Sequence, residues 1–416
     1  MNKIKRIIKI LPIFTLIIFL MMQNHIVFAD EETTEPTIYS NSCILVDNAT
    51  GQILFEHDAE EQVYPASTTK LMTAILVMEN CNLDDKVTVT KEAISSVPYS
   101  YATSNISAGE TFTVEELLNV MLIPSANDIA NALAIHVAGS IDSFAEMMNT
   151  RAAELGAKNT HFVNPSGIHN ENHYTTAYDL SLIGRHASTF EKLREICKKT
   201  EYEILPAKDG SERKYETTNH LIDSESKYFY EYATGLKTGY TDAAKNCIIA
   251  SAKKDDMDLI CVILGGGKSE KNESYREIDC HTLFDYGFNN FEYKTVCKKD
   301  NLVDASELGE LPEVLKDAQI AYGDTIERYI NKNNTIAKEV KWNDELKRPI
   351  QKGSKLGTIT YNIDGENFTI DLIAYENIES PFSAILNSSL LPIAIMVLIV
   401  AVVSYNKKKR NTKRRI

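Results

Sequence analysis

Strand-like segments lie at both ends of a long helical stretch, and this order of elements limits the possible folds more than any other feature of the sequence. The segment CILVDNATGQILFEHDAEE, which begins at Cys43, reads as two short strands around an Asn-Ala-Thr-Gly turn. Strand signals return at Ala233–Tyr240, Asn246–Ala252 and Asp258–Leu264, the last two joined by a Lys-Lys-Asp-Asp turn. We therefore expect a mixed α/β domain with a helical lobe inserted between early and late strands.

The residues between these strand segments carry helix signals. Thr113-Val-Glu-Glu116 is a capping box in front of an apolar run. Amphipathic helices are expected at Asn127–Val137 and Asp142–Leu155, the second ended by Gly156. A last helix through Tyr275–Tyr286 closes the domain.

The pattern changes beyond residue 292. The segment GTITYNIDGENFTIDLIAYENI alternates apolar and polar residues around Asp364-Gly365, which is typical of a hairpin, and Ile336–Trp342 is similarly β-like. We expect residues 292–380 to form a small β-sandwich. This region holds no cluster of reactive side chains, so spacing or docking is its expected work.

Both ends of the chain carry apolar runs beside basic residues. Residues 1–29 contain four basic residues before an uncharged run that ends at Ala29, which is typical of a secretory signal peptide. The uncharged run 386–405 is about long enough to span a bilayer. Because the basic residues follow it at 406–416 on one side only, a transmembrane helix with a cytoplasmic tail is favoured over a buried core helix.

Charge and cysteine usage exclude several function classes. The two basic ends contribute +11 to an overall charge of −14, so residues 30–405 carry −25. Such a body is not expected to bind nucleic acid, and its length of roughly 350 residues suggests two domains. The seven cysteines are scattered and form neither a CxxC motif nor a cluster at zinc spacing, so small buried residues are the favoured interpretation.

A serine and a lysine lie three residues apart in YPASTTKLMTAILVMEN, at the start of an apolar helix. If a low pKa keeps Lys70 neutral, it can take the proton of the Ser67 hydroxyl and make it a nucleophile. The alternative is a helix cap at Ser67 and a lysine that extends to solvent. The same spacing recurs from four other serines, at residues 211, 224, 251 and 404, without an apolar helix directly behind it.

Two further stretches favour the catalytic interpretation. MLIPSANDIANAL places Ser125 and Asn127 after a proline, in a loop between two helices, where both side chains are free for another partner. ATGLKTGYTDAA places Lys237, Thr238 and Gly239 on a strand, with the glycine where a substrate backbone could approach closely.

With these motifs the chain resembles the low-molecular-weight D-alanyl-D-alanine carboxypeptidases, penicillin-binding proteins of the serine type in peptidase family S11. The motifs Ser-x-x-Lys, Ser-x-Asn and Lys-Thr-Gly occur in that order. PASTTKLMTA, MLIPSANDIANALA, FVNPSGIHNENHYTTAYDL, GLKTGYTDAAKNC and YREIDCHTLFDYGF also match family blocks. The resemblance implies a β-lactamase/DD-peptidase-like domain at residues 36–290, with an antiparallel sheet flanked by helices, then the β-sandwich and the membrane anchor.

The resemblance also implies roles for individual residues in acyl transfer. Ser67 would be the acylated nucleophile and Lys70 its proton acceptor, while Ser125 would relay a proton to the leaving D-alanine. Asn127 would hold the substrate amide and Lys70. The backbone N–H groups of Ser67 and Tyr240 would form the oxyanion hole.

Other residues would recognise the end of the substrate chain. The resemblance implies that Lys237 supplies positive charge, that Thr238 and Arg276 bind the terminal carboxylate, and that Gly239 lines the substrate site. A peptide that ends in D-Ala-D-Ala offers a free carboxylate, and fixed cations select for it.

The function implied is removal of the terminal D-alanine from peptidoglycan stem pentapeptides, with covalent binding of β-lactams and no cofactor. A catalytically weak wall-binding or morphogenesis scaffold, a DD-endopeptidase or a β-lactamase on the same fold remain alternatives.

The E-x-x-L-N pattern at Glu115–Asn119 precedes Ser-x-Asn and is interpreted as the start of a capped helix. His169 and His173 lie among turn-forming residues, which does not favour a metal site. Lys245 stands where relatives usually have glycine.

Overall fold

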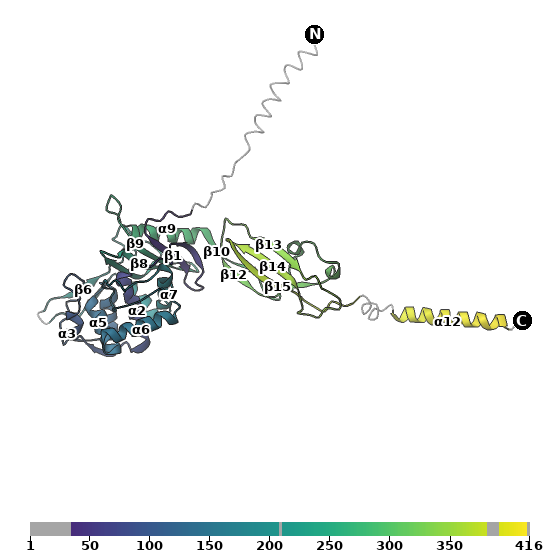
Figure 1. Cartoon of the computed structure of the whole chain (residues 1–416), viewed down its shortest axis with the longest axis horizontal. Coiled ribbons are helices and arrows are strands. Elements are labelled where there is room, and N and C mark those ends of the chain that lie inside the picture. Colours follow the sequence, from purple (N-terminus) through teal and green to yellow (C-terminus); the bar gives the residue numbers. More distant parts are fainter. Residues whose placement is uncertain (1–34, 208–209, 381–390, 414–416) are drawn as a thin grey trace, which may run out of the picture. The chain divides into compact units, whose positions relative to one another are not determined.

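The structure is a computed structural model that describes residues 35–207, 210–380 and 391–413. Figure 1 colours the chain from purple at the N-terminus to yellow at the C-terminus. The predicted signal peptide, residues 1–29, lies outside the described residues.

Early and late strands pair in one five-stranded sheet, as the strand signals predict. The sheet has the order β2-β1-β9-β8-β7, and every neighbouring pair is antiparallel. Its strands are β1 (Ser42–Asp47), β2 (Ile53–His57), β7 (Ala233–Thr241), β8 (Lys245–Lys254) and β9 (Met257–Gly266). Strand β7 pairs with β8 alone among the sheet strands and therefore forms one edge.

Alternate residues of the sheet face two separate apolar clusters. In β1, Ile44 and Val46 belong to the cluster that includes the helical lobe, whereas Cys43 and Leu45 belong to a second cluster with α9 (Tyr275–Asn290). Successive side chains of a strand point to opposite faces, so a strand buried on both faces must be apolar throughout. Figure 1 shows α9 on one face of the sheet and the lobe helices on the other.

The lobe contains most of the helices. They are α2 (Lys70–Asn80), α3 (Lys91–Ser95), α4 (Val114–Leu122), α5 (Asn127–Ala138), α6 (Ile141–Glu154), α7 (Ala177–Ala187) and α8 (Glu191–Cys197), with the 3₁₀ turn η1 (Ala66–Thr69) before α2. Two short antiparallel pairs join β3 (Lys86–Thr88) to β4 (Thr111–Thr113) and β5 (Glu201–Ile204) to β6 (Arg213–Glu216). The predicted capping box is present, because Thr113 and Glu116 each accept a hydrogen bond from the other's backbone N–H. Glu115–Asn119 therefore belongs to an ordinary capped helix.

The C-terminal domain is built from two sheets around one apolar cluster, as a β-sandwich is. The smaller sheet pairs β10 (Phe291–Cys297) with β12 (Ile326–Asn331). The larger has the order β11-β15-β14-β13, with β11 (Ile320–Tyr322), β13 (Ala337–Trp342), β14 (Lys355–Ile363) and β15 (Glu366–Ala374). The short helix α10 (Ala305–Leu308) and the 3₁₀ turn η2 (Glu313–Leu315) connect them. The predicted hairpin around Asp364 is β14–β15.

The seven cysteines all fall within the described residues and are free thiols, and six of them are buried. This confirms their interpretation as small buried residues. Burial raises the pKa of the Cys197 thiol to about 12, which keeps it protonated and unreactive.

The predicted transmembrane helix, 386–405, falls partly on residues outside the described part of the chain. The structure describes a helix α12 (Leu391–Lys413) there. Among residues 35–207, 210–380 and 391–413, no helix has both the length and the apolar character needed to cross a membrane.

Lys245 opens strand β8 with a backbone conformation that suits glycine. Its φ angle is +58°, in the left-handed region, and its side chain is exposed. Because the side chain extends into solvent, a long residue fits there, while its Cβ strains the backbone. The local geometry explains why glycine would suit this position.

Replacing Lys245 by glycine should stabilise the protein by about 1 kcal/mol, because it removes the left-handed strain. Thermal unfolding of the purified full-length protein in detergent measures the effect. The matched control is Lys253→Gly, an exposed position in the same strand without positive φ. There glycine should cost about 0.5–1 kcal/mol, and equal shifts for both variants would contradict the strain.

Candidate active site

The turn before α2 orients Ser67 and Lys70 toward each other. The Thr68 and Thr69 hydroxyls donate to the carbonyls of Pro65 (2.8 Å) and Ala66 (2.8 Å), which fixes the 3₁₀ turn η1. Every residue from Lys70 to Val77 in α2 is buried. The Lys70 amine is therefore held at the start of a helix that has no solvent-facing side over its first two turns.

Lys70 makes three hydrogen bonds and is 0% exposed. Its Nζ lies 2.9 Å from Ser67 Oγ, 2.7 Å from Asn127 Oδ1 and 2.7 Å from the Ser166 carbonyl oxygen. Neither η1 nor α2 has a side-chain cap. The alternative of a capping serine and a solvent-directed lysine is therefore wrong for this pair.

The surroundings of Lys70 disfavour its charged form. Burial lowers the pKa of Lys70 well below its usual value, and the positive charge of Lys237 lowers it further, while Asp128 opposes both effects. The positive end of the α2 dipole acts in the same direction as Lys237. A neutral amine at hydrogen-bond distance from a hydroxyl can act as a general base.

Ser125 reaches the site from the turn before α5, and Asn127 reaches it from the first turn of that helix. Ser125 has a φ of +68°, and its Oγ is buried without a hydrogen-bond partner among the described residues. Asn127 is the first residue of α5, which confirms the helix expected at Asn127–Val137, whereas the prediction that its side chain lies in a loop is wrong. Its Nδ2 donates to the Ala102 carbonyl (2.9 Å), which turns Oδ1 toward Lys70.

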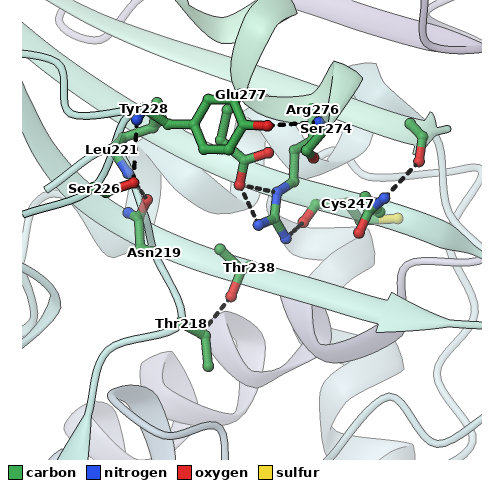
Figure 2. A network of polar contacts seen from close by, with 12 residues as sticks. Thr218, Asn219, Leu221, Ser226, Tyr228, Thr238, Cys247, Ser274, Arg276 and Glu277 are labelled. Atoms are coloured by element: carbon green, nitrogen blue, oxygen red, sulfur yellow. Dashed lines mark hydrogen bonds and ion pairs between the residues drawn. The ribbon is translucent and has the colours of Figure 1, made fainter. Parts of the chain in front are cut away.

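Strand β7 of the sheet contributes Lys237 and Thr238 to the site. Lys237 is 1% exposed, and its Nζ donates to the Thr238 carbonyl (3.0 Å). Burial lowers the pKa of Lys237 to about 7, with Arg276 adding to the effect and Cys197 opposing it. The hydroxyl of Thr238 lies 2.5 Å from that of Thr218 (Figure 2).

Gly239 allows β7 to pack directly against η1. A Cβ at this position would lie 2.8 Å from the Ser67 backbone nitrogen and 3.1 Å from the Pro65 carbonyl oxygen. The close approach that the sequence suggests at Gly239 is therefore made by the protein's own backbone. Gly239 also lines the adjoining cleft.

Arg276 lies in the first turn of α9 and reaches the same cleft. Its Nε donates to Glu277 Oε1 (2.9 Å), and its Nη2 forms an ion pair with the same oxygen. Its Nη1 lies 3.5 Å from the Cys247 carbonyl oxygen (Figure 2).

A cleft of about 520 Å³ brings most of the predicted residues together. Its lining includes Ser67, Ser125, Asn127, Thr238, Gly239, Tyr240 and Arg276. Lys70 and Lys237 are buried behind this wall. Tyr240 follows Gly239 on the edge strand and is 57% exposed.

Sequence reasoning missed two contributors to the site, Ser166 and Thr218. Asn164 Oδ1 accepts hydrogen bonds from the backbone N–H groups of Ser166 and Gly167, a turn that directs the Ser166 carbonyl to Lys70. Gly167 has a φ of +82°, and a Cβ there would lie 1.8 Å from the Ala66 oxygen. The Asn-Pro-Ser-Gly sequence signals such a turn, but nothing in it signals a lysine partner.

The two histidines of this segment have separate contacts. His173 is buried, with Nε2 2.9 Å from Thr69 Oγ1 and Nδ1 accepting from the Val163 N–H (3.2 Å). Burial lowers the pKa of His173 to about 3. His169 packs edge-on against the ring of Tyr64. His173 therefore supports the η1 turn through its contact with Thr69.

Comparisons with known proteins agree with this geometry. The family model described as D-alanyl-D-alanine carboxypeptidase, Peptidase S11, matches residues 29–268, and that of the C-terminal domain of penicillin-binding protein 5 matches residues 291–380. The D-alanyl-D-alanine carboxypeptidase DacF of Bacillus subtilis is 32% identical, over 81% of this chain and 85% of its own length. DacC of Escherichia coli is 32% identical, over 87% and 90% respectively.

A solved structure extends the likeness in fold to the C-terminal domain. The crystal structure of the D-alanyl-D-alanine carboxypeptidase DacD from Francisella tularensis has a TM-score of 0.68 and 22% identity, and covers 86% of this chain and 99% of that one. The family model covers more than half of the chain, and its match contains the Ser-x-x-Lys, Ser-x-Asn and Lys-Thr-Gly motifs. The chain belongs to the D-alanyl-D-alanine carboxypeptidase family, peptidase family S11.

Proposed function

We propose that this chain is a serine-type D-Ala-D-Ala carboxypeptidase that removes the terminal D-alanine of peptidoglycan stem pentapeptides through an acyl-enzyme on Ser67. The observation that carries the proposal is the buried Lys70 amine, 2.9 Å from Ser67 Oγ, with a pKa that burial lowers. A base and a nucleophile at hydrogen-bond distance are the minimum for covalent acyl transfer.

The acylation step follows from these positions. Ser67 Oγ attacks the carbonyl carbon of the penultimate D-alanine while its proton passes to Lys70 Nζ. When the C–N bond breaks, the leaving amine needs a proton. Ser125 Oγ is buried beside the site, has no hydrogen-bond partner in the part of the chain that the structure describes, and is suited to relay one. Water then attacks the ester, and Ser67 regains its proton.

Backbone and cationic groups complete the proposed substrate site. The N–H groups of Ser67 and Tyr240 would stabilise the oxyanion, and a donor of this kind is worth about 100-fold or more in rate. Lys237, Thr238 and Arg276 would bind the terminal carboxylate. A β-lactam presents a reactive carbonyl and a carboxylate in a similar relation, so covalent capture of penicillin on Ser67 is expected.

We further propose the division of the chain and its location. Residues 1–29 direct export, 36–290 form the catalytic domain and 292–380 the β-sandwich. The uncharged run 386–405, followed by the basic tail, supports a transmembrane anchor with the catalytic domain outside the cell.

Replacing Ser67 by alanine should abolish D-alanine release from a pentapeptide that ends in D-Ala-D-Ala, because no acyl-enzyme can form. Labelled penicillin should leave no adduct on this variant, as mass spectrometry of the intact protein would show. Release of D-alanine at the wild-type rate by the Ser67→Ala variant would reject the mechanism. Absence of release and adduct from the wild-type protein itself would favour a scaffold role.

Replacing Lys70 by arginine should slow acylation by about 100-fold or more, because a guanidinium stays charged and cannot accept a proton. Stopped-flow measurement of penicillin binding gives the acylation rate directly. Thermal unfolding of the same sample separates a lost base from a lost fold. Near-normal acylation by folded Lys70→Arg would contradict the role of Lys70 as base.

The KM for the peptide should rise as the pH increases through about 7. Lys237 is charged below its pKa of about 7 and neutral above it, so attraction of the terminal carboxylate is lost on the alkaline side. The pKa of Lys70 is also lowered, chiefly by burial, to well below its usual value. A pH profile of KM measures the change. In Lys237→Arg, which keeps its charge, the rise should be absent, and an identical rise would assign the titration to another group.

A further inference from the structure

Glu277 is a buried carboxylate beside the cleft to which the mechanism above gives no part. It follows Arg276 in the first turn of α9 and is 0% exposed. Its Oε1 accepts from both Nε and Nη2 of Arg276, so one oxygen engages two of the three guanidinium nitrogens (Figure 2). Figure 2 shows both side chains next to each other above the Thr218–Thr238 pair.

The carboxylate keeps its charge in this buried position. Burial raises the pKa of Glu277, but the Arg276 guanidinium outweighs burial and the net pKa lies below its usual value. Its second oxygen, Oε2, is buried and has no hydrogen bond of normal geometry within the described part of the chain. Burying a charge with incomplete hydrogen bonding is costly, so this ion pair is weak evidence for stability and calls for another role.

The remaining contacts fix the third guanidinium nitrogen relative to the sheet. Nη1 lies 3.5 Å from the Cys247 carbonyl oxygen, at the limit of a hydrogen bond, and therefore retains donor capacity for a ligand. The Arg276 side chain lines the cleft together with Thr238. An arginine whose Nε and Nη2 are both engaged presents its Nη1 edge in one orientation.

The segment from Thr218 to Tyr228 contacts both Thr238 and the start of α9. The Ser274 N–H donates to Tyr228 Oη (2.8 Å), and the Tyr228 N–H donates to Ser226 Oγ (3.1 Å) (Figure 2). The same segment begins near Thr218, which contacts Thr238. The start of α9 is thereby tied to the loop that supports the hydroxyl side of the carboxylate site.

We propose that Glu277 is a positioning residue that holds the Arg276 guanidinium in the orientation that binds the terminal carboxylate of the peptide. Glu277 acts through Arg276 and touches no reacting atom. This inference rests on the proposed carboxypeptidase function and adds to it a residue that sets affinity for free chain ends.

The decisive experiment compares E277Q, R276Q and the double variant R276Q/E277Q in the full-length protein in detergent, with a peptide ending in D-Ala-D-Ala. E277Q should raise KM about tenfold and change kcat less than about threefold, because ground-state and transition-state binding are lost together. The double variant should be no worse than R276Q, because Glu277 has no effect once Arg276 is gone.

The matched control is Asp258→Asn, which breaks a partly buried ion pair with Arg194 (2.9 Å) away from the cleft lining. It should leave KM and kcat unchanged while lowering the unfolding temperature. A purely structural Glu277 would behave like this control.

An unchanged or lower KM in E277Q, or additive effects in the double variant, would overturn the proposal. If E277Q does not fold, E277D decides, because its shorter carboxylate keeps the charge but withdraws from Arg276, and its KM should also rise severalfold. If the wild-type protein releases no D-alanine, the proposed function fails, which is a different outcome from a wild-type-like E277Q.

Discussion

The site depends on a single constraint, which is that an amine is buried where its charged form is disfavoured. The Lys70 Nζ is surrounded by a hydroxyl, an amide oxygen and a carbonyl, all of which accept hydrogen bonds without adding a full negative charge. Elements distant in sequence supply these three groups: the η1 turn, the first turn of α5 and the turn around Ser166. The second lysine, Lys237, then raises the cost of charging Lys70. The chemistry of Ser67 follows from this arrangement.

Much of the fold was predictable because a short continuous apolar run between turn signals indicates a strand that is buried on both faces. The apolar run from Cys43 to Val46 contributes residues to both apolar clusters, and the late strands β8 and β9 do the same. Residue type also identified the candidates for the cleft, since a serine, a lysine at helical spacing and a Lys-Thr-Gly strand have a known chemical logic. The Glu115–Asn119 pattern was separated from them by its place before Ser-x-Asn and by its capping box.

The features of the site that could not be predicted depend on contacts that no local sequence pattern signals. The Ser166 carbonyl is a backbone group, so no residue type signals its bond to Lys70. Gly239 was expected to face substrate, but its lack of a Cβ first makes room for the Pro65–Ser67 backbone. Lys245 adopts a conformation that its residue type disfavours, and propensity gives no warning of that.

The position of β7 at the edge of the sheet affects how a substrate could be bound. An edge strand leaves N–H and C=O groups without sheet partners, and proteins usually guard such rows against pairing with other chains. Here the open side at Gly239 and Tyr240 belongs to the cleft wall. In the proposed function, a row of groups that would be an aggregation hazard elsewhere would pair with one short added strand, whose direction the proposed contact with Arg276 would set.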